Sequence, residues 1–285
     1  MHGYIGRFAP SPTGPLHLGS LLAALISYLD ARKNQGQWLV RIEDIDPPRE
    51  RAGSASRILK TLETHGLAWD QDVRYQSSCA QRYEEQLATL LSAKLCYYCP
   101  CSRKQLADRK GEHLPSCGKF HGEQPKDGAV RFQTKQKPLQ WNDVLLGPKT
   151  EKLDSDFILK RRDGLYSYQL AVVSDDIDQK ITHVIRGMDL LSSTPMQLAL
   201  YDSLDSAAPE FGHFPLVTNT QGQKLSKQNL APAVDDTAPI KNLALLGSWL
   251  GFEFPNGTNR PEDYLTYYLD QWDRSRFQPN EDYVI

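Results

Sequence analysis

The residues best placed for phosphate chemistry lie near the N-terminus, in the stretch 7–20 with the sequence RFAPSPTGPLHLGS. The apolar segment from Tyr4 to Phe8 predicts a β-strand, and apolar residues at helical spacing after Gly19 predict a helix packed by one face on a sheet. The start of a helix presents free backbone N–H groups and the positive end of its dipole, which favour phosphate. His17 and Gly19 lie at this predicted phosphate site.

The composition indicates a globular protein. The chain has 285 residues, 40% of them hydrophobic, which is enough for a substantial core in one large or two modest domains. No apolar run is long enough to span a bilayer, and the N-terminus lacks a secretion signal, so we expect a cytoplasmic protein with no membrane partner. The formal net charge of −2 means that nucleic acid must be bound through local basic patches. Without a heptad pattern or a large apolar stripe, we expect a monomer.

The string PSPTGPLHLGS resembles the signature of class I aminoacyl-tRNA synthetases, and the opening RFAPSPTG resembles the glutamate-specific branch of that family. HLGS takes the place of the family's HIGH tetrapeptide, so the resemblance implies that His17 and Gly19 bind ATP and act in catalysis. It also implies that the residues before them bind the amino acid, namely Arg7, Phe8, Ala9, Pro10 and Ser11. A lone HxG would instead indicate a plain strand-to-helix connection, and the length of the match favours the synthetase interpretation.

A second predicted strand, Gln37 to Ile42, runs directly into the acidic residues Glu43, Asp44 and Asp46. In an open parallel sheet ligands bind beyond the carboxyl ends of the strands, so these carboxylates are placed to meet whatever the first loop holds. In the family that the sequence resembles, Glu43 occupies the position that holds the amino group of the substrate. The alternative is a solvated turn that caps the next helix.

Five cysteines lie at positions 79, 96, 99, 101 and 117, and this clustering favours a metal over a disulfide framework. A structural Zn²⁺ prefers four sulfur or nitrogen ligands, and we expect these to be Cys99, Cys101, His113 and Cys117. His121 or Cys96 could take the place of His113, and free buried thiols are the alternative to a metal. The resemblance agrees with a zinc, because glutamyl-type synthetases often carry one in the insertion that receives the acceptor end of tRNA.

The second half of the predicted nucleotide-binding fold begins near residue 164. YQLAVVSDD at 168–176 and THVIRGMD at 182–189 resemble YxxAVVxDD and THVIRGED of glutamyl-tRNA synthetases. The resemblance implies that Tyr168 and Arg186 reach the amino acid. A guanidinium offers a bidentate grip on the carboxylate that the reaction spares, and Arg7 is the alternative for this grip.

Two lysines follow in QKLSKQ at 223–228, which resembles the family's second signature, KMSKS. Lysines on a loop suit a phosphate whose negative charge grows during in-line attack, and removing such a donor typically costs about 3 kcal/mol. The resemblance implies that Lys224 and Lys227 bind ATP and that Lys227 is catalytic. KLSK alone would indicate a solvated loop, but here it follows HLGS in the order that a split fold requires.

The remaining periodic segments predict helices over 52–65, 81–93, 193–204, 240–250 and 264–269, and strands over 129–132, 143–146, 157–160 and 214–217. The expected fold class is α/β, with a Rossmann-type parallel sheet split by a zinc-containing insertion and a short helical C-terminal part. We assign 1–95 and 161–230 to the halves of the catalytic domain, 96–160 to an inserted acceptor-binding module, and 231–285 to a helical segment without an anticodon-binding domain.

The described family that matches both these motifs and this length is that of glutamyl-queuosine tRNA(Asp) synthetases. The resemblance implies that glutamate is activated with ATP and Mg²⁺ to glutamyl-adenylate and is then transferred to the queuosine base of tRNA(Asp). The expected partners are therefore ATP, L-glutamate and tRNA(Asp) that carries queuosine. Two alternatives stay open: a minimal glutamyl-tRNA synthetase that charges the 3′ end of tRNA(Glu), and a non-catalytic paralogue that binds RNA or an amino acid.

Overall fold

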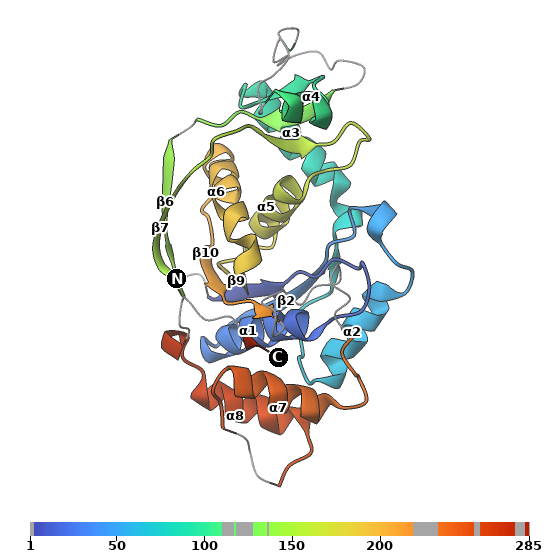
Figure 1. Cartoon of the computed structure of the whole chain (residues 1–285), viewed down its shortest axis with the longest axis vertical. Coiled ribbons are helices and arrows are strands. Elements are labelled where there is room, and N and C mark those ends of the chain that lie inside the picture. The colour runs from blue at the N-terminus through green and yellow to red at the C-terminus, as the bar shows by residue number, and fades with distance from the viewer. Residues whose placement is uncertain are drawn as a thin grey trace.

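The computed structural model describes residues 3–109, 117, 128–135, 137–218, 233–253, 257–276 and 283–284. At its centre lies a five-stranded parallel sheet in the order β10-β9-β1-β2-β3 (Figure 1). The strands are β1 (Ile5–Phe8), β2 (Gln37–Ile42), β3 (Arg74–Tyr75), β9 (His183–Gly187) and β10 (Glu210–Phe214). The predicted α/β fold with a Rossmann-type parallel sheet is confirmed.

The strand order reverses in the middle of the sheet. From β1 the chain adds β2 and then β3 on one side, whereas β9 and β10 lie on the other side of β1. In open parallel sheets ligands bind in the crevice that forms at such a reversal, outside the carboxyl ends of the strands. The topology therefore points to a binding site next to Phe8 and Gly187, the last residues of β1 and β9.

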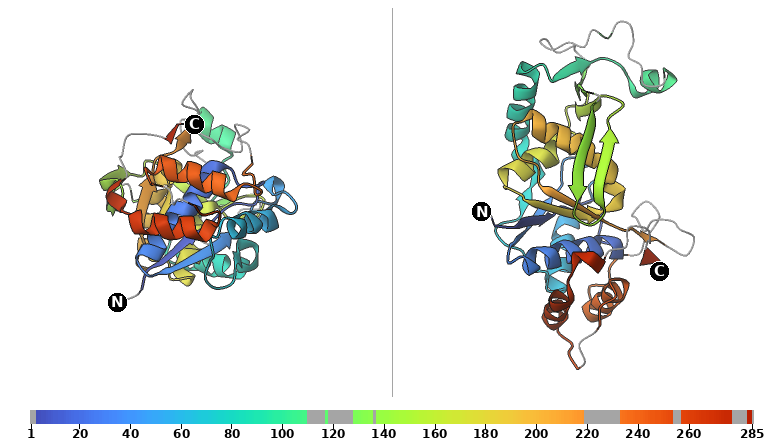
Figure 2. Two further views of the ribbon diagram at one scale, coloured as in Figure 1. Left: turned by 90° about the horizontal axis from the view of Figure 1, so that it is seen from below. Right: turned by 90° about the vertical axis from the view of Figure 1, so that its left-hand side faces the viewer.

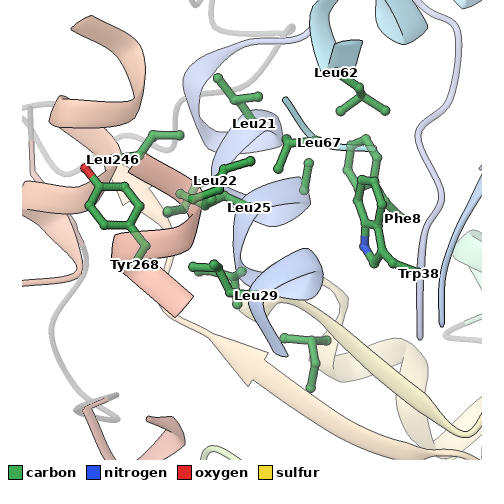
Figure 3. Close-up of a cluster of buried hydrophobic side chains, with 14 of the residues drawn as sticks. Phe8, Leu21, Leu22, Leu25, Leu29, Trp38, Leu62, Leu67, Leu246 and Tyr268 are labelled. Atoms are coloured by element: carbon green, nitrogen blue, oxygen red, sulfur yellow. The ribbon is translucent and has the colours of Figure 1, made fainter. Parts of the chain in front are cut away.

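Helix α1 (Leu18–Lys33) follows β1 through the proline-rich loop, as the sequence predicts. It is buried on two faces rather than on the single face expected. One face packs on the sheet, and the other is covered by α7 (Pro239–Trp249) and α8 (Pro261–Gln271). In Figure 3 the leucines of α1 lie between Phe8 and Trp38 on one side and Leu246 and Tyr268 on the other. Burial of each such side chain contributes about 1.5–3 kcal/mol. Because α1 is packed on both sides, it lies at the centre of this core.

The opposite face of the sheet is covered by α3 (Ala80–Ser92), α5 (Tyr168–Asp178) and α6 (Thr194–Ser203). Their buried residues pack with Leu39, Val184 and Phe211 of the sheet. Helix α2 (Ser54–Thr64) packs instead on the α1 side, through Ile58. The sheet therefore lies between two helical layers. None of the helices in the described part of the chain is long and apolar enough to cross a membrane.

An inserted module separates β3 from β9 in sequence, and its helix α4 (Arg103–Asp108) lies at the opposite end of the molecule from α7 and α8 (Figure 2). An antiparallel sheet of the module contains β4 (Cys96–Cys99), β5 (Ala129–Phe132) and β8 (Phe157–Lys160). A separate hairpin consists of β6 (Pro138–Asp143) and β7 (Gly147–Lys152).

The strand predicted over 143–146 is wrong, because β6 ends at Asp143 and residues 144–146 form the hairpin turn. Oδ1 of Asp143 accepts hydrogen bonds from the N–H groups of Leu145 (3.1 Å) and Leu146 (3.0 Å). This local bonding satisfies the backbone without strand pairing.

The strand predicted over 214–217 is also wrong. Strand β10 ends at Phe214, and a separate strand, β11 (Val217–Thr218), pairs in parallel with β12 (Tyr283–Val284). Pro215 lies between the two strands, and a proline has no N–H to donate to a sheet. The C-terminal segment therefore contributes a strand as well as the helices predicted for it.

Candidate active site

A cavity of about 780 Å³ opens at the carboxyl ends of the central strands, where the strand order reverses. Its wall includes residues that end strands or follow them directly: Phe8, Glu43, Gly187 and Phe214. The connection between β1 and α1 and the start of α5 complete the wall. A cavity of this size suits a small-molecule ligand.

Ten of the residues predicted to contact ATP or the amino acid line this cavity, and they come from three distant segments. They are Arg7, Phe8, Ala9, Pro10, Ser11, His17, Gly19, Glu43, Tyr168 and Arg186. The other two, Lys224 and Lys227, lie outside the described residues. The fold thus brings the early signature and the THVIRG segment to one place.

His17 is the N-cap of α1, and Ser20 holds its side chain. Nδ1 of His17 accepts a hydrogen bond from the N–H of Ser20 (3.2 Å), and Nε2 lies 2.9 Å from the Ser20 hydroxyl. The first turn of α1 carries no acidic residue that would neutralise the positive end of the helix dipole. The helix start therefore offers an anion site at the cavity wall.

The stretch 219–232, which contains both lysines of the second signature, has flanks that lie near this helix start. On one side Leu216 lines the cavity, and on the other Ala233 forms an antiparallel bridge with His17. The residue after Ala233 donates a backbone hydrogen bond of 2.9 Å to the carbonyl of Leu16. One flank of the second signature thus lies at the cavity, and the other is bonded beside the first signature.

Two arginines of the sheet share one buried carboxylate. Nε and Nη2 of Arg7 donate to the two oxygens of Asp176 at 3.3 Å, and Nη2 of Arg41 donates to its Oδ1 at 2.6 Å. All three side chains are no more than 5% exposed. Burial raises the pKa of Asp176, but Arg41 and Arg7 outweigh this and hold the pKa below its ordinary value. Asp176 is therefore ionised at neutral pH and neutralises much of the charge of Arg7.

Arg186 differs from Arg7 because, among the described residues, its guanidinium donates to neutral acceptors alone. These are His213 Nε2 (3.0 Å), Gln197 Oε1 (2.9 Å), Thr194 Oγ1 (2.9 Å), the Leu190 carbonyl (3.3 Å) and the Tyr168 hydroxyl (3.4 Å). The side chain is 4% exposed, and burial lowers its pKa. Arg186 is thus a buried cation on the cavity wall, suited to an anionic ligand group.

Glu43 lies on the same wall, and burial raises its pKa to about 7. The charges of Arg41 and Arg7 oppose this shift, while the nearby carboxylates of Asp176 and Asp175 add to it. A cation placed against Glu43 would favour its ionised form. The position therefore suits a positively charged ligand group.

We expect Glu43 to make the ligand-free protein less stable as the pH rises. In the unfolded chain this residue releases its proton near pH 4.5, whereas the folded protein retains it up to about pH 7. Between these values the folded state binds more protons, so the free energy of unfolding falls with rising pH. The variant Glu43→Gln should be close to wild type at about pH 4 and more stable by about 1–3 kcal/mol at pH 8. Denaturant unfolding at both pH values measures this, and equal stabilities at pH 8 would contradict the raised pKa.

Three of the four predicted metal ligands form a cluster in the inserted module. The Sγ atoms of Cys99, Cys101 and Cys117 lie within 4.8 Å of one another, and those of Cys99 and Cys117 are 3.8 Å apart. With Zn–S bonds of about 2.3 Å, the edge of a tetrahedral site is about 3.8 Å, so the three thiols fit a metal. Cys96 instead lies in the apolar core beneath α3 and α5, where burial raises its pKa to about 12. The candidate histidines at 113 and 121 lie outside the described residues.

Sequence reasoning missed three residues that organise the site. Asp176 belongs to the motif that indicated Tyr168, but the motif did not indicate that it pairs with Arg7. Asp143 and His213 are 70 residues apart and form a buried pair beside Arg186, at 2.5 Å. The one signal in the sequence that could have indicated His213 is its place near the end of a central strand. That signal is weak, because many such histidines are structural.

The comparisons with known proteins agree with this geometry. Residues 5–242 match the family model described as tRNA synthetases class I (E and Q), catalytic domain, and the chain belongs to this family.

Proteins named glutamyl-Q tRNA(Asp) synthetase are similar over nearly the whole chain. One from Neisseria meningitidis serogroup C is 46% identical over 285 residues, which cover 96% of this chain and 97% of the relative. One from Vibrio vulnificus is 45% identical over 274 residues, which cover 94% of this chain and 89% of the relative. Among solved structures, a glutamate tRNA ligase from Elizabethkingia meningosepticum in complex with its amino acid matches with a TM-score of 0.79 at 24% identity. The match covers 99% of this chain and 67% of the ligase chain. At that identity the structural match supports the fold alone.

Proposed function

We propose that this protein activates glutamate with ATP to form glutamyl-adenylate and then transfers the glutamate to the queuosine base of tRNA(Asp). The proposal is carried by two features that share one cavity. One is Arg186, a buried cation that donates only to uncharged groups among the described residues, and the other is a helix start suited to phosphate. An amino acid with a second carboxylate and a nucleotide match these two features. The names of the relatives support tRNA(Asp) as the acceptor.

The amino acid is assigned to the wall that contains Arg186, Tyr168 and Glu43. The two longest contacts of Arg186, to the Tyr168 hydroxyl and to a backbone carbonyl, come from its two different terminal nitrogens. A carboxylate that replaced both would bind in bidentate geometry while three shorter hydrogen bonds hold the guanidinium. We assign the side-chain carboxylate to Arg186 because Arg7 is already paired with Asp176. Glu43 would hold the ammonium group, whose charge favours the ionised carboxylate.

ATP is assigned to the start of α1, where His17 and Gly19 line the cavity. Lys224 and Lys227 are assigned to the triphosphate, because Ala233, which follows the stretch that contains them, forms a bridge with His17. Mg²⁺ would accompany ATP and neutralise part of the phosphate charge. The residues from Phe8 to Ser11 line the same cavity.

The chemistry requires positioning and charge neutralisation, with no protein nucleophile. An oxygen of the α-carboxylate bonds to the α-phosphorus of ATP in line, and the bond from that phosphorus to pyrophosphate breaks. In the second step a nucleophilic group of the modified base attacks the acyl carbon, loses its proton and displaces AMP. Lys227 and the N–H groups of the helix start would stabilise the charge that develops on the phosphate.

Two assays test the proposal. Glutamate-dependent ATP–pyrophosphate exchange should be observed, and its absence with every amino acid would identify a non-catalytic paralogue. Labelled glutamate should be transferred to tRNA(Asp) that carries queuosine and not to tRNA(Asp) that lacks it. Transfer to the 3′ end of tRNA(Glu) would instead identify a minimal glutamyl-tRNA synthetase.

The cysteine cluster is proposed to bind one structural Zn²⁺ per chain. Metal analysis of the purified protein should find one zinc equivalent, and finding none would contradict the proposal. Cys99→Ser and Cys117→Ser should lose the metal and unfold at a lower temperature, because folding is coupled to metal binding. Cys96→Ser is the matched control that should keep the zinc. The variants His113→Ala and His121→Ala are then compared, and the one that loses the zinc identifies the fourth ligand.

A further inference from the structure

Beyond the proposed reaction, we infer that Asp143 and His213 are positioning residues for Arg186. The carboxylate of Asp143 fixes the ring tautomer of His213, and the ring holds the guanidinium of Arg186 at the cavity wall. The inference rests on the proposed function in one respect, which is that the ligand of Arg186 is taken to be glutamate. Neither residue lines the cavity, so both act through Arg186.

The tautomer follows from the partners of the ring. Nδ1 of His213 lies 2.5 Å from Oδ2 of Asp143, and Nε2 lies 3.0 Å from Nε of Arg186. An ionised carboxylate accepts hydrogen bonds and a guanidinium donates them, so the ring carries its proton on Nδ1 and accepts at Nε2. The other tautomer would place two N–H groups against each other. His213 and Asp143 are fully buried, so water cannot replace either contact.

The carboxylate of Asp143 is itself held in place. Its Oδ1 accepts hydrogen bonds from three backbone N–H groups, those of Leu145, Leu146 and His213, at 3.0–3.1 Å. The hairpin turn is also bonded to β10, because the N–H of Val144 donates to the carbonyl of Phe211 at 2.8 Å.

Gly212, which lies between Phe211 and His213, permits this close approach of the turn to β10. A Cβ atom on Gly212 would lie 2.7 Å from side-chain atoms of Val144 and Ile185. The turn after Asp143 is therefore held against β10, and the hairpin of the inserted module supports Arg186 at the cavity wall through His213.

The charges of the three groups explain why Arg186 can be buried and still receive a ligand. Burial lowers the pKa of His213 and the charge of Arg186 adds to this, while the hydrogen bond that the ring donates to Asp143 opposes it, so the ring is neutral. The Asp143 carboxylate then balances the charge of Arg186 from the far side of the ring. Asp176, in contrast, contacts Arg7 directly and accepts hydrogen bonds from two of its nitrogens, Nε and Nη2. Arg186 keeps both terminal nitrogens for uncharged partners that a carboxylate can displace.

The variant Asp143→Asn tests the role of the tautomer. The amide oxygen can still accept from the three backbone N–H groups, but the amide nitrogen donates to Nδ1 of His213 and moves the ring proton to Nε2, against Arg186. We expect KM for glutamate in ATP–pyrophosphate exchange to rise roughly 10–100-fold, as for other residues that orient a binding side chain, with KM for ATP within about twofold of wild type. Asp156→Asn is the matched control: this carboxylate of the same module accepts from the Tyr97 hydroxyl (2.6 Å) and the Thr134 N–H (2.9 Å), and its loss should leave KM for glutamate unchanged.

A double-variant cycle separates positioning from a general loss of structure. In His213→Gln the side chain has no ring tautomer for Asp143 to set, so adding Asp143→Asn should raise KM for glutamate no further. Losses that add in the double variant would indicate an independent structural role and would overturn the inference. The ¹⁵N NMR signals of the His213 ring give a readout in the wild type itself, where Nδ1 should carry the proton. A wild-type ring protonated on Nε2 would overturn the inference even if Asp143→Asn does not fold.

These outcomes are distinct from failure of the proposed function. A wild type without glutamate-dependent exchange would contradict the function. An active wild type whose Asp143→Asn variant keeps the KM for glutamate would contradict the positioning role alone.

Discussion

Replacing Arg186 with glutamine is expected to lower kcat/KM for glutamate by roughly 10²–10³-fold in ATP–pyrophosphate exchange, with little change in KM for ATP. The guanidinium is buried, and the described groups that accept its hydrogen bonds are uncharged. A bound carboxylate would therefore be the negative charge in direct contact with it. A neutral amide cannot compensate a carboxylate that is buried beside it. Arg186→Lys should also be impaired, because an ammonium group lacks the planar fork that binds both oxygens.

The stability of the Arg186→Gln variant separates a binding role from a structural one. Burial lowers the pKa of Arg186, so the loss of a buried charge offsets part of the cost of losing its hydrogen bonds, and the melting temperature should fall by only a few degrees. Arg82→Gln is a suitable control, because Arg82 is 32% exposed, pairs with Asp178 at 3.0 Å and does not line the cavity. We expect the control to keep kcat/KM for glutamate within about threefold. An Arg186→Gln variant that is unstable but binds glutamate normally would show that the arginine is structural.

The parts of the site that could be predicted from the sequence share one physical basis. Arg7, Glu43 and Arg186 lie in parallel strands near their carboxyl ends or directly after them, and parallel strands end at one edge of the sheet. Short motifs at three strand ends therefore imply a common site without knowledge of tertiary contacts. Part of the cysteine cluster could also be predicted from local sequence, because Cys99 and Cys101 are only two residues apart.

The parts that could not be predicted depend on contacts between distant segments. The second buried face of α1 exists because α7 and α8 fold back on it, and a helical pattern does not reveal how many faces will be covered. Residues 143–146 were predicted as one strand because apolar residues follow Asp143, whereas the strand ends at Asp143 and its carboxylate bonds the turn that follows and His213. The pairing of Asp176 with two arginines likewise joins three separate elements.

Replacing Asp176 with alanine is expected to lower the free energy of unfolding by roughly 3–5 kcal/mol, the largest effect on stability that we predict. Arg7 and Arg41 would lose the carboxylate between them while remaining buried at 5% and 0% exposure. Asp178→Ala is the matched control on the same helix. Its carboxylate is 32% exposed and pairs with the part-exposed Arg74 at 2.6 Å and Arg82 at 3.0 Å, so its loss should cost less than about 1 kcal/mol.

The pH dependence of this difference identifies the charge of Asp176 as its cause. The pKa of Asp176 in the folded protein lies below its ordinary value of 3.8, so its stabilising effect is present above that value and is lost as the pH falls through the folded pKa. The gap between wild type and Asp176→Ala in denaturant unfolding should therefore be constant from about pH 8 to pH 5 and shrink below about pH 4. If the gap is the same at pH 3 as at pH 7, packing of the side chain rather than its charge stabilises the fold. In that case Arg7 does not depend on Asp176 for its neutralisation, and the assignment of the substrate carboxylate to Arg186 over Arg7 loses its basis.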